Sequence, residues 1–252
     1  MPVNLRVADG VAYVTLNRYE KRNALDETML AQLEEAVGTA GRDQDVRVLV
    51  LRGSGGFFCA GADISEWTDP GPDQADRLSR LGTGALNQIA ALNAPTVAVV
   101  ERSALGGGLE LALACDLRIT SHDAVFGYPE ARLGNLTSWG GIARVVDTVG
   151  LAHARRLFMT ARPIDGREAE RIGLVTQAVD QKDLERVVAQ TVTDVAGCDP
   201  LALRVLKDAL RGFERKQFLE PALAALFSQS VASRNRKHAF FDQNTTSMGR
   251  TT

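Results

Sequence analysis

Glu110 and Glu130 are the two residues of this sequence best suited to acid–base chemistry. They lie twenty positions apart, and each closes a glycine-containing run: LGGGLE at 105–110 and FGYPE at 126–130. Burial of a carboxylate among apolar side chains disfavours its charged form, so its pKa rises. Two such groups in one dry pocket could give and take a proton near neutral pH. The pair therefore predicts a catalytic site.

Two further segments could supply backbone N–H donors to that site. Residues 57–64 (FFCAGADI) follow a strand-like run, and Gly106, Gly107 and Gly108 precede an apolar helical stretch. Small residues allow a ligand to approach the backbone, and free N–H groups at a helix start favour negative charge. Two such amides converging on one oxygen would form an oxyanion hole. Either segment alone is weak evidence, because glycine turns before helices are common.

Alternating strands and helices must position these residues. The predicted strands are 11–16, 46–51, 96–100, 117–120 and 174–179. The predicted helices are one that Asp26 caps, 78–92, 109–115, 151–159, 166–172, 183–196, 200–213 and 219–234. Residues 65–76 are either a lid or a plain connector. The pattern favours an α/β fold that becomes mostly helical after about residue 145.

Composition favours a soluble cytoplasmic protein. The 252 residues include 29 Lys and Arg against 31 Asp and Glu, so the net charge of −2 gives no footprint for nucleic acid or for an anionic membrane. The N-terminus has no signal-peptide pattern, and no apolar run approaches the length of a membrane span. The cysteines and histidines lack metal-ligand or disulfide spacing, so neither a metal nor a disulfide is expected: Cys59, Cys115, Cys198, His122, His153 and His238.

Together these motifs resemble the crotonase superfamily, the enoyl-CoA hydratase/isomerase family. The resemblance runs from Val11 to about Val179 and includes LNR at 16–18, NAL at 23–25, and residues 60–64, 105–116, 126–130 and 154–175. It implies a crotonase-like α/β fold of repeated ββα units with a C-terminal helical region. Residues 1–195 would form the catalytic core. Residues 196–252 would assemble a homotrimer or homohexamer.

The resemblance also assigns site residues. The amides of Ala62 and Gly107 would bind the thioester carbonyl of an acyl-CoA, and Glu110 and Glu130 would hold a water molecule. Coenzyme A would be part of the substrate, with no separate cofactor. The CoA contacts that the resemblance implies are Lys21, Arg22, Ala24, Ala60, Asp63 and Ile64. For Lys21 and Arg22, a solvated charged turn is an equally good interpretation.

The chain departs from the family after Glu130. Where the family usually has Pro-Gly-x-Gly-Gly, residues 137–141 read TSWGG. Ser138 stands at a glycine position, where a positive φ would strain it. Trp139 stands where a small residue is usual, and its indole either lines the acyl pocket or points into the core. We expect the acyl pocket to involve Ser138 and Trp139.

Hydration of a 2-enoyl-CoA to a 3-hydroxyacyl-CoA is the leading functional hypothesis. Isomerases of the family generally lack a residue like Glu110, so its presence argues against double-bond isomerisation. CoA-thioester hydrolysis and decarboxylation remain open because of the unusual turn. RNA binding is disfavoured because the helix after Asp26 is acidic, with Glu27, Glu34 and Glu35. The sequence contains no Gly-x-Ser-x-Gly motif, so it gives no support for a serine hydrolase.

Overall fold

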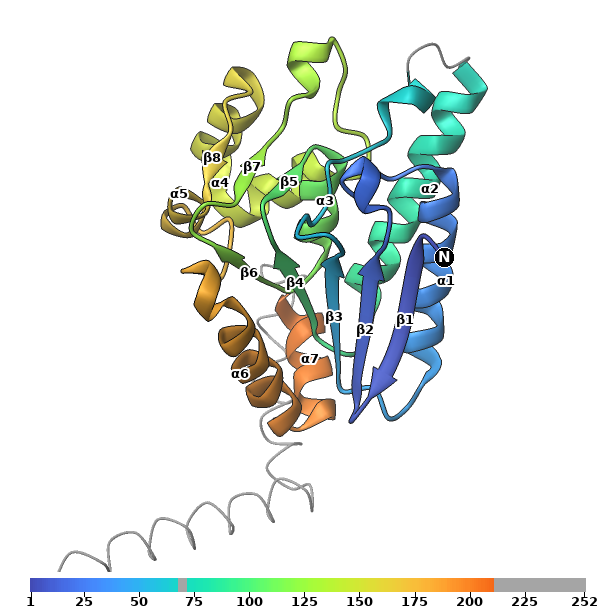
Figure 1. Ribbon diagram of the computed structural model, residues 1–252, viewed down its shortest axis with the longest axis vertical. Coiled ribbons are helices and arrows are strands. Elements are labelled where there is room, and N and C mark those ends of the chain that lie inside the picture. Colours follow the sequence, from blue (N-terminus) through green and yellow to red (C-terminus); the bar gives the residue numbers. More distant parts are fainter. Residues whose placement is uncertain (68–71, 211–252) are drawn as a thin grey trace, which may run out of the picture. The chain divides into compact units, whose positions relative to one another are not determined.

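The computed structural model describes residues 1–67 and 72–210, and the chain divides into two compact units, residues 1–197 and 198–252. The first unit contains a six-stranded sheet in the order β1 (Val3–Ala8), β2 (Val11–Leu16), β3 (Val48–Gly53), β4 (Thr96–Val100), β6 (Leu117–Ser121) and β9 (Gln177–Val179). A smaller sheet has the order β5 (Ser103–Leu105), β7 (Val125–Gly127) and β8 (Ile164–Asp165). Figure 1 shows the helices that accompany these strands.

The helices of the first unit are α1 (Glu27–Arg42), α2 (Pro72–Ala91), α3 (Gly107–Ala114), α4 (Gly141–Thr160), α5 (Gly166–Arg171) and α6 (Leu184–Gly197). Short 3-10 segments are η1 (Tyr19–Lys21), η2 (Ile64–Trp67), η3 (Glu130–Leu133) and η4 (Gln181–Asp183). The described part of the second unit contains α7 (Pro200–Leu210). The α/β fold class is confirmed.

The large sheet is buried on both faces, which explains why its central strands are almost wholly apolar. Leu49 and Leu51 of β3 pack into the core that α1, α2 and α3 share, whereas Val48 and Val50 pack with α6 on the other face. Successive side chains of a strand point to opposite faces, so an unbroken apolar run fills two layers at once. In Figure 1, α1 and α6 lie on opposite sides of the sheet.

Local signals explain several element boundaries. Asp26 caps α1, its carboxylate accepting a hydrogen bond from the Met29 amide at 2.8 Å. Strands β2 and β4 have the predicted bounds. Strand β3 begins two residues later than predicted, because Val46 is still in the turn that follows α1, where its amide donates to Asp43.

Other boundaries differ more from the prediction. Residues 72–76 belong to α2, so the loop predicted over 65–76, as lid or as connector, is wrong there; residues 68–71 lie outside the described part. Pro72 suits a helix start because its fixed φ is already helical. Helix α4 begins at Gly141, ten residues before the predicted start, and Gly150 interrupts it at φ +73°. Predicted helix 219–234 lies outside the described residues.

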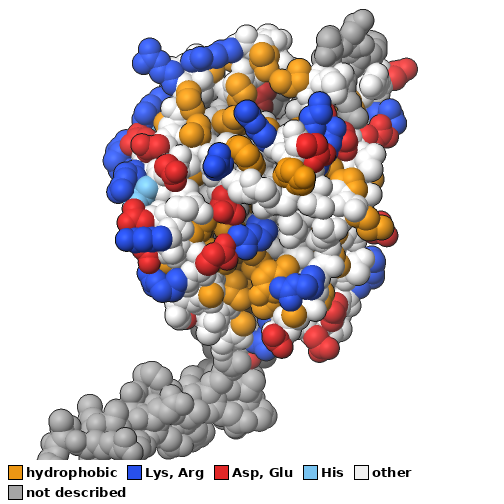
Figure 2. All heavy atoms as spheres, viewed as in Figure 1, with side chains coloured by type: hydrophobic (Ala, Val, Ile, Leu, Met, Phe, Trp, Pro, Cys, Tyr) orange, Lys and Arg blue, Asp and Glu red, His pale blue; other side chains and the backbone are white. Residues whose placement is uncertain are grey.

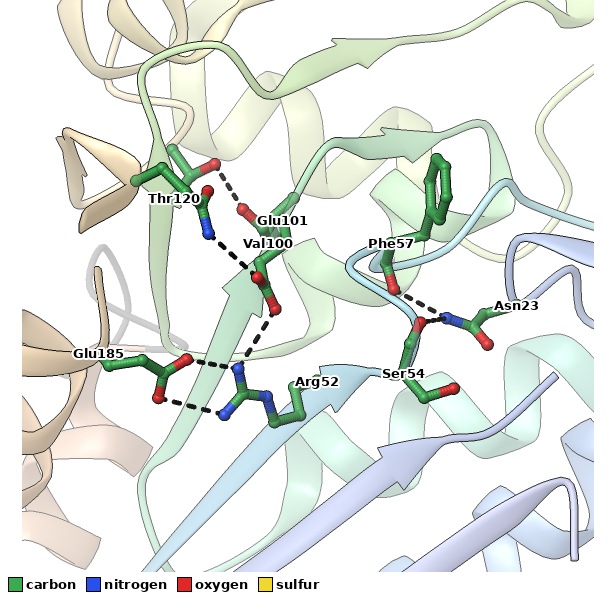
Figure 3. Close-up of polar contacts among 9 residues, drawn as sticks. Asn23, Arg52, Ser54, Phe57, Val100, Glu101, Thr120 and Glu185 are labelled. Carbon is green, nitrogen blue, oxygen red and sulfur yellow. Dashed lines mark hydrogen bonds and ion pairs between the residues drawn. The ribbon is translucent and has the colours of Figure 1, made fainter. Parts of the chain in front are cut away.

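A charged cluster links α6 to the ends of β3 and β4. Arg52 contacts Glu185 at 2.5 Å and Glu101 at 3.2 Å, and Gln181 donates to Glu101 at 3.1 Å. Figure 3 shows the Arg52 guanidinium between the two carboxylates. These contacts join the start of α6 and the residues before it to the ends of two strands of the large sheet.

Charges of both signs are interspersed on the described part of the surface that Figure 2 displays. Within residues 1–67 and 72–210, no helix is long and apolar enough to cross a membrane. The same residues contain no group of three or more His, Cys, Asp and Glu side chains arranged to hold a metal ion.

Candidate active site

Strand pairing brings the two glutamates together. Strands β5 and β7 are parallel, with Leu105 opposite Gly127, and the Gly106 amide donates to the Gly127 carbonyl at 2.9 Å. After β5 the backbone continues into α3, which carries Glu110. After β7 it leads to Glu130. Because parallel strands end at the same edge of a sheet, residues twenty positions apart in sequence meet at one place.

Gly106 makes room for the second glutamate. Its φ of +50° is unfavourable for other residues, and a Cβ at this position would lie 2.4 Å from Glu130 Oε1. Any side chain here would therefore displace the Glu130 carboxylate. The absence of a side chain at Gly106 therefore allows the Glu130 carboxylate to lie next to the start of α3.

Glu110 is buried, with 2 % of its surface exposed, and the protein stabilises its anion directly. Its Oε1 accepts hydrogen bonds from the amides of Gly141 at 2.7 Å and Trp139 at 2.9 Å. Burial raises the pKa of Glu110, while these two amides and the charge of Arg144 act in the opposite direction. Both amides bind the same oxygen, which leaves Oε2 for a water molecule.

Glu130 lies in a different environment. Among the described residues its Oε2 is buried without a hydrogen-bond partner. Burial, together with the negative charge of Glu110, raises the pKa of Glu130 to about 7. The two carboxylates therefore differ in their chemistry: Glu110 is held as an acceptor, and Glu130 is suited to carry a proton near neutral pH.

Arg144 fastens the turn that holds Glu110. Its Nη1 donates to the Trp139 carbonyl at 2.7 Å, and its Nη2 donates to Asn87 Oδ1 on α2, also at 2.7 Å. The guanidinium fixes the peptide whose neighbouring amides bind Glu110, and it contributes a positive charge near that carboxylate. Arg144 is thus a positioning residue that the sequence analysis missed.

A signal for Arg144 did exist in the sequence. It lies in the first turn of α4, where the helix dipole favours acidic residues and disfavours basic ones. This cost of about 0.3–1 kcal/mol favours the interpretation that the arginine there binds a specific acceptor. The position of Arg144 in the helix became known only with the start of α4, which lies ten residues before the start that the sequence predicts.

The segment that carries Ala62 lies against the start of α3. Cys59 pairs with Ala104 in a parallel bridge, and a Cβ at Gly61 would lie 3.4 Å from the Gly107 nitrogen. Asn23, wholly buried, holds the preceding loop by donating to the carbonyls of Ser54 at 3.0 Å and Phe57 at 2.7 Å, as Figure 3 shows. The NAL motif at 23–25 thus supports this loop.

Two backbone amides are available at this junction. Leu25 pairs with Gly61 and Asp63 on one side of the bridge, so the intervening amide of Ala62 points to the other side. Gly107 is the first residue of α3 and has no intrahelical acceptor. Within the described residues neither of these two amides donates a hydrogen bond. Both residues line the same cavity as the glutamates.

This cavity has a volume of about 570 Å³, within the range usual for small-molecule sites. Its lining residues are Ala60, Gly61, Ala62, Ile64, Ala75, Gly106, Gly107, Glu110, Pro129, Glu130, Leu133, Gly134, Asn135, Leu136, Thr137, Ser138 and Trp139. Apolar side chains dominate, and the two carboxylates are its only acidic groups among the described residues. The two carboxylates thus lie beside a largely apolar lining, and burial raises the pKa of each.

The residues predicted to contact CoA divide into two sets. Ala60 and Ile64 line the cavity, and Ile64 is 63 % exposed. Lys21 and Arg22 are exposed in and after η1, outside the cavity lining. Of these, the Arg22 side chain lies over the Phe57 ring, 5.7 Å from its centre.

Two other predicted CoA contacts are engaged within the protein. Arg18 binds the Asp63 carboxylate at 2.7 Å and the Ala24 carbonyl at 3.0 Å. Burial opposes the charge of Asp63, but hydrogen bonds from Ser65 and the contact with Arg18 outweigh it and lower the pKa of Asp63. A ligand would therefore compete with Arg18 for both groups.

The turn over residues 137–141 corrects one expectation. Ser138 does not have a positive φ, so the predicted strain at this residue is wrong; Gly140 carries the positive φ, at +88°. The backbone turns at a glycine after all, two residues later than expected. The sequence left open whether the Trp139 indole lines the pocket or points into the core. It does both, because Trp139 is 2 % exposed and also lines the cavity.

Comparisons with known proteins identify the family of this chain. The model of the enoyl-CoA hydratase/isomerase family matches residues 6–250. The bovine (Bos taurus) mitochondrial enoyl-CoA hydratase domain-containing protein 2 is 38 % identical over 237 residues, which are 90 % of this chain and 79 % of the relative. The short-chain-enoyl-CoA hydratase of Clostridium acetobutylicum is 36 % identical over 206 residues, 81 % of this chain and 79 % of that protein.

The crystal structure of an enoyl-CoA hydratase from Bacillus anthracis superposes with a TM-score of 0.91. It is 27 % identical in sequence, and the match covers 96 % of this chain and 97 % of that one. The likeness thus extends over nearly the whole chain.

Proposed function

Because the chain belongs to the enoyl-CoA hydratase/isomerase family, we propose that it adds water across the double bond of a 2-enoyl-CoA. One observation carries the proposal: two carboxylates, one held by backbone amides and the other with a buried oxygen that lacks a partner among the described residues, share a cavity with two available N–H groups. Hydration requires a base, an acid and stabilisation of an enolate, and this site has a candidate for each.

The amides of Ala62 and Gly107 are proposed to bind the thioester oxygen. As the oxygen of water bonds to Cβ, the π electrons move toward the carbonyl and negative charge accumulates on that oxygen. Donors already in place stabilise this charge more than they stabilise the ground state. One such donor is typically worth about 3–4 kcal/mol, so the pair would account for much of the rate enhancement.

The proposed division of labour between the glutamates follows from their surroundings. Glu110, whose anion two amides and Arg144 stabilise, accepts the proton of the attacking water. Glu130, whose pKa is raised to about 7, delivers a proton to Cα as the enolate collapses. One proton is taken up and one is given in each turnover, so exchange between the carboxylates through water restores the starting state.

Isomerisation is the nearest rival, because it needs the same oxyanion hole but only one carboxylate to move a proton. A second carboxylate held at 2.7 Å by a backbone amide has no part in that reaction. Thioester hydrolysis would direct water to the carbonyl carbon instead of Cβ. Each rival reaction therefore differs from hydration in the substrate it uses or in the product it releases.

The direct test is to mix the purified protein with crotonyl-CoA and follow the absorbance of the conjugated enoyl thioester, with product analysis by mass spectrometry. The proposal expects loss of absorbance with a gain of one water and no free thiol. Release of free CoA would instead identify a hydrolase. An unchanged substrate, together with conversion of a 3-enoyl-CoA to its 2-enoyl isomer, would identify an isomerase.

Replacement of Arg144 is expected to alter the pH profile. In Arg144→Met the positive charge near Glu110 is lost, so the pKa of Glu110 rises and the base is protonated over a wider range. The acid limb of kcat/KM should therefore move to higher pH, while the alkaline limb, which depends on Glu130, should stay in place, so that the pH range of activity becomes narrower. Measurement of kcat/KM from pH 5 to 9 checks this expectation.

Two controls separate charge from position. Arg155→Met removes an exposed arginine from the same helix and should leave the profile unchanged. Arg144→Lys keeps the charge but loses the two-armed contact to Trp139 and Asn87. If Arg144→Met lowers activity equally at every pH, Arg144 has only a structural role.

A further inference from the structure

Trp139 occupies space that two glycines leave open. A Cβ at Gly82 of α2 would lie 2.2 Å from the indole, and a Cβ at Gly107 of α3 would lie 2.3 Å from its outer edge. The indole is therefore wedged between two helices at positions that have no side chain. Because a glycine destabilises a helix interior relative to alanine, Gly82 has a cost that its contact with Trp139 explains.

The Trp139 side chain is held firmly in this position. The Trp139 amide is bound to Glu110 and its carbonyl to Arg144, so the backbone is held on both sides. The indole itself is 2 % exposed and is packed in the main core of the unit. A group packed this closely resists displacement by a ligand, because protein interiors have little spare volume.

The indole nitrogen shows that stability alone does not account for this tryptophan. Within the described residues Nε1 is buried without a hydrogen-bond partner, and it lies 2.3 Å from the position of a Cβ on Gly82. A buried donor without an acceptor costs stability. Nε1 therefore faces α2, and the benzo edge of the ring lies at Gly107, beside the proposed oxyanion donor.

This placement limits the acyl group. The thioester carbonyl would lie at Gly107, and Cβ must lie where water on Glu110 can reach it. The indole of Trp139 lies against Gly107, and the backbone amide of Trp139 donates to Glu110. The substituent on Cβ therefore begins beside a rigid aromatic wall.

We infer that Trp139, seated against Gly82, closes the acyl pocket and restricts the enzyme to short-chain acyl-CoA substrates. The inference rests on the proposed function, because it uses the predicted positions of the carbonyl and Cβ. It assigns Trp139 and Gly82 as the residues that determine chain length.

Binding of saturated acyl-CoAs tests the inference without requiring any reaction. Affinities for butyryl-, hexanoyl-, octanoyl- and decanoyl-CoA are measured by calorimetry. Each methylene that finds an open apolar pocket should strengthen binding roughly fourfold. The wild type should gain nothing beyond six carbons and should bind decanoyl-CoA at least tenfold more weakly than butyryl-CoA. In Trp139→Ala, decanoyl-CoA should become the tighter ligand by at least tenfold.

Variants of the two helix glycines provide matched controls. Gly82→Ala would force the indole to move and should weaken butyryl-CoA binding by about tenfold or more. Gly84 is on the same helix, and a Cβ placed there would have no other atom within 4 Å, so Gly84→Ala should leave the affinities unchanged. If Trp139→Ala does not fold, Trp139→Phe, which keeps an aromatic core residue but shortens it, should extend the limit by two or more carbons.

Two results would overturn the inference. One is tighter binding of decanoyl-CoA than of butyryl-CoA by the wild type, which would mean that long chains leave the cavity past Leu133 and Leu136. The other is the same chain-length profile in wild type and Trp139→Phe. Failure of the proposed function is a separate result: crotonyl-CoA would not be hydrated, yet saturated acyl-CoAs would still follow the Trp139-dependent profile.

Discussion

Glu110→Gln is expected to lower kcat/KM for crotonyl-CoA by about 10²–10⁴, the usual contribution of a general base. Glutamine has nearly the same size and keeps an oxygen that can accept the amides of Trp139 and Gly141, so the turn should stay in place. The amide group cannot remove a proton from water, however. The loss should therefore fall on kcat, with little change in the affinity for saturated acyl-CoAs.

Measurement of kcat and KM separately, together with butyryl-CoA binding, checks this result. Glu34→Gln, which removes an exposed carboxylate from α1, is the matched control and should behave like the wild type. A Glu110→Gln enzyme that turns over within tenfold of the wild type would exclude Glu110 as the base. In that case the two amides on its carboxylate would serve only to begin α4.

Glu130→Gln is expected to lose activity by a similar factor, about 10²–10⁴, because glutamine has no acidic proton to deliver to Cα. The wild-type enzyme should also lose kcat/KM as the pH rises above about 7. The reason is that Glu130, whose pKa is raised to about 7, then becomes ionised and can no longer act as an acid. Rate measurements from pH 5 to 9 on both proteins check this expectation.

The same substitution should stabilise the protein at alkaline pH. The folded-state pKa of Glu130 lies above its ordinary value of 4.5, so the folded state binds the proton more tightly than the unfolded state does. Wild-type stability from this group is fully present below about pH 4.5 and is lost as the pH rises through about 7. Glutamine carries no charge at any pH, so the advantage of Glu130→Gln should grow between about pH 4.5 and pH 7 and stay constant at higher pH.

Thermal unfolding at pH 6 and pH 8 measures this difference. The gain in Tm of Glu130→Gln over the wild type should be larger at pH 8 than at pH 6. Glu35→Gln, at an exposed position of α1, should show no such dependence. Equal Tm differences at the two pH values would mean that Glu130 is ionised in the folded protein throughout, which would remove the basis for its role as the acid.

Some of the fold was predictable because its signals are local. Strands β2 and β4 and the Asp26 cap depend on short runs of side chains, and these matched the structure. Strand β1 had a local signal that the sequence analysis did not use. Asp9 and Gly10, both with positive φ, form the two-residue turn typical of a tight hairpin, which pairs Ala8 with Val11.

The short strands β5, β7 and β8 could not be predicted, because two or three residues contain no usable periodicity. Their pairing is nevertheless what brings Glu110 and Glu130 to one cavity. The start of α4 was also misplaced, since Gly140 and Gly141 resemble a turn until the backbone between them is known. Arg144 was missed as a consequence.

The sequence by itself determined the residue types of the site and the family, because the motifs that carry them are short and contiguous. Only the tertiary structure decided what each residue does. Two equivalent glutamates became an amide-bound acceptor and a proton-holding acid, because burial and hydrogen bonding differ at sites that long-range packing creates. Trp139 became a wall of the cavity because Gly82, fifty-seven residues earlier, has no side chain to exclude the indole.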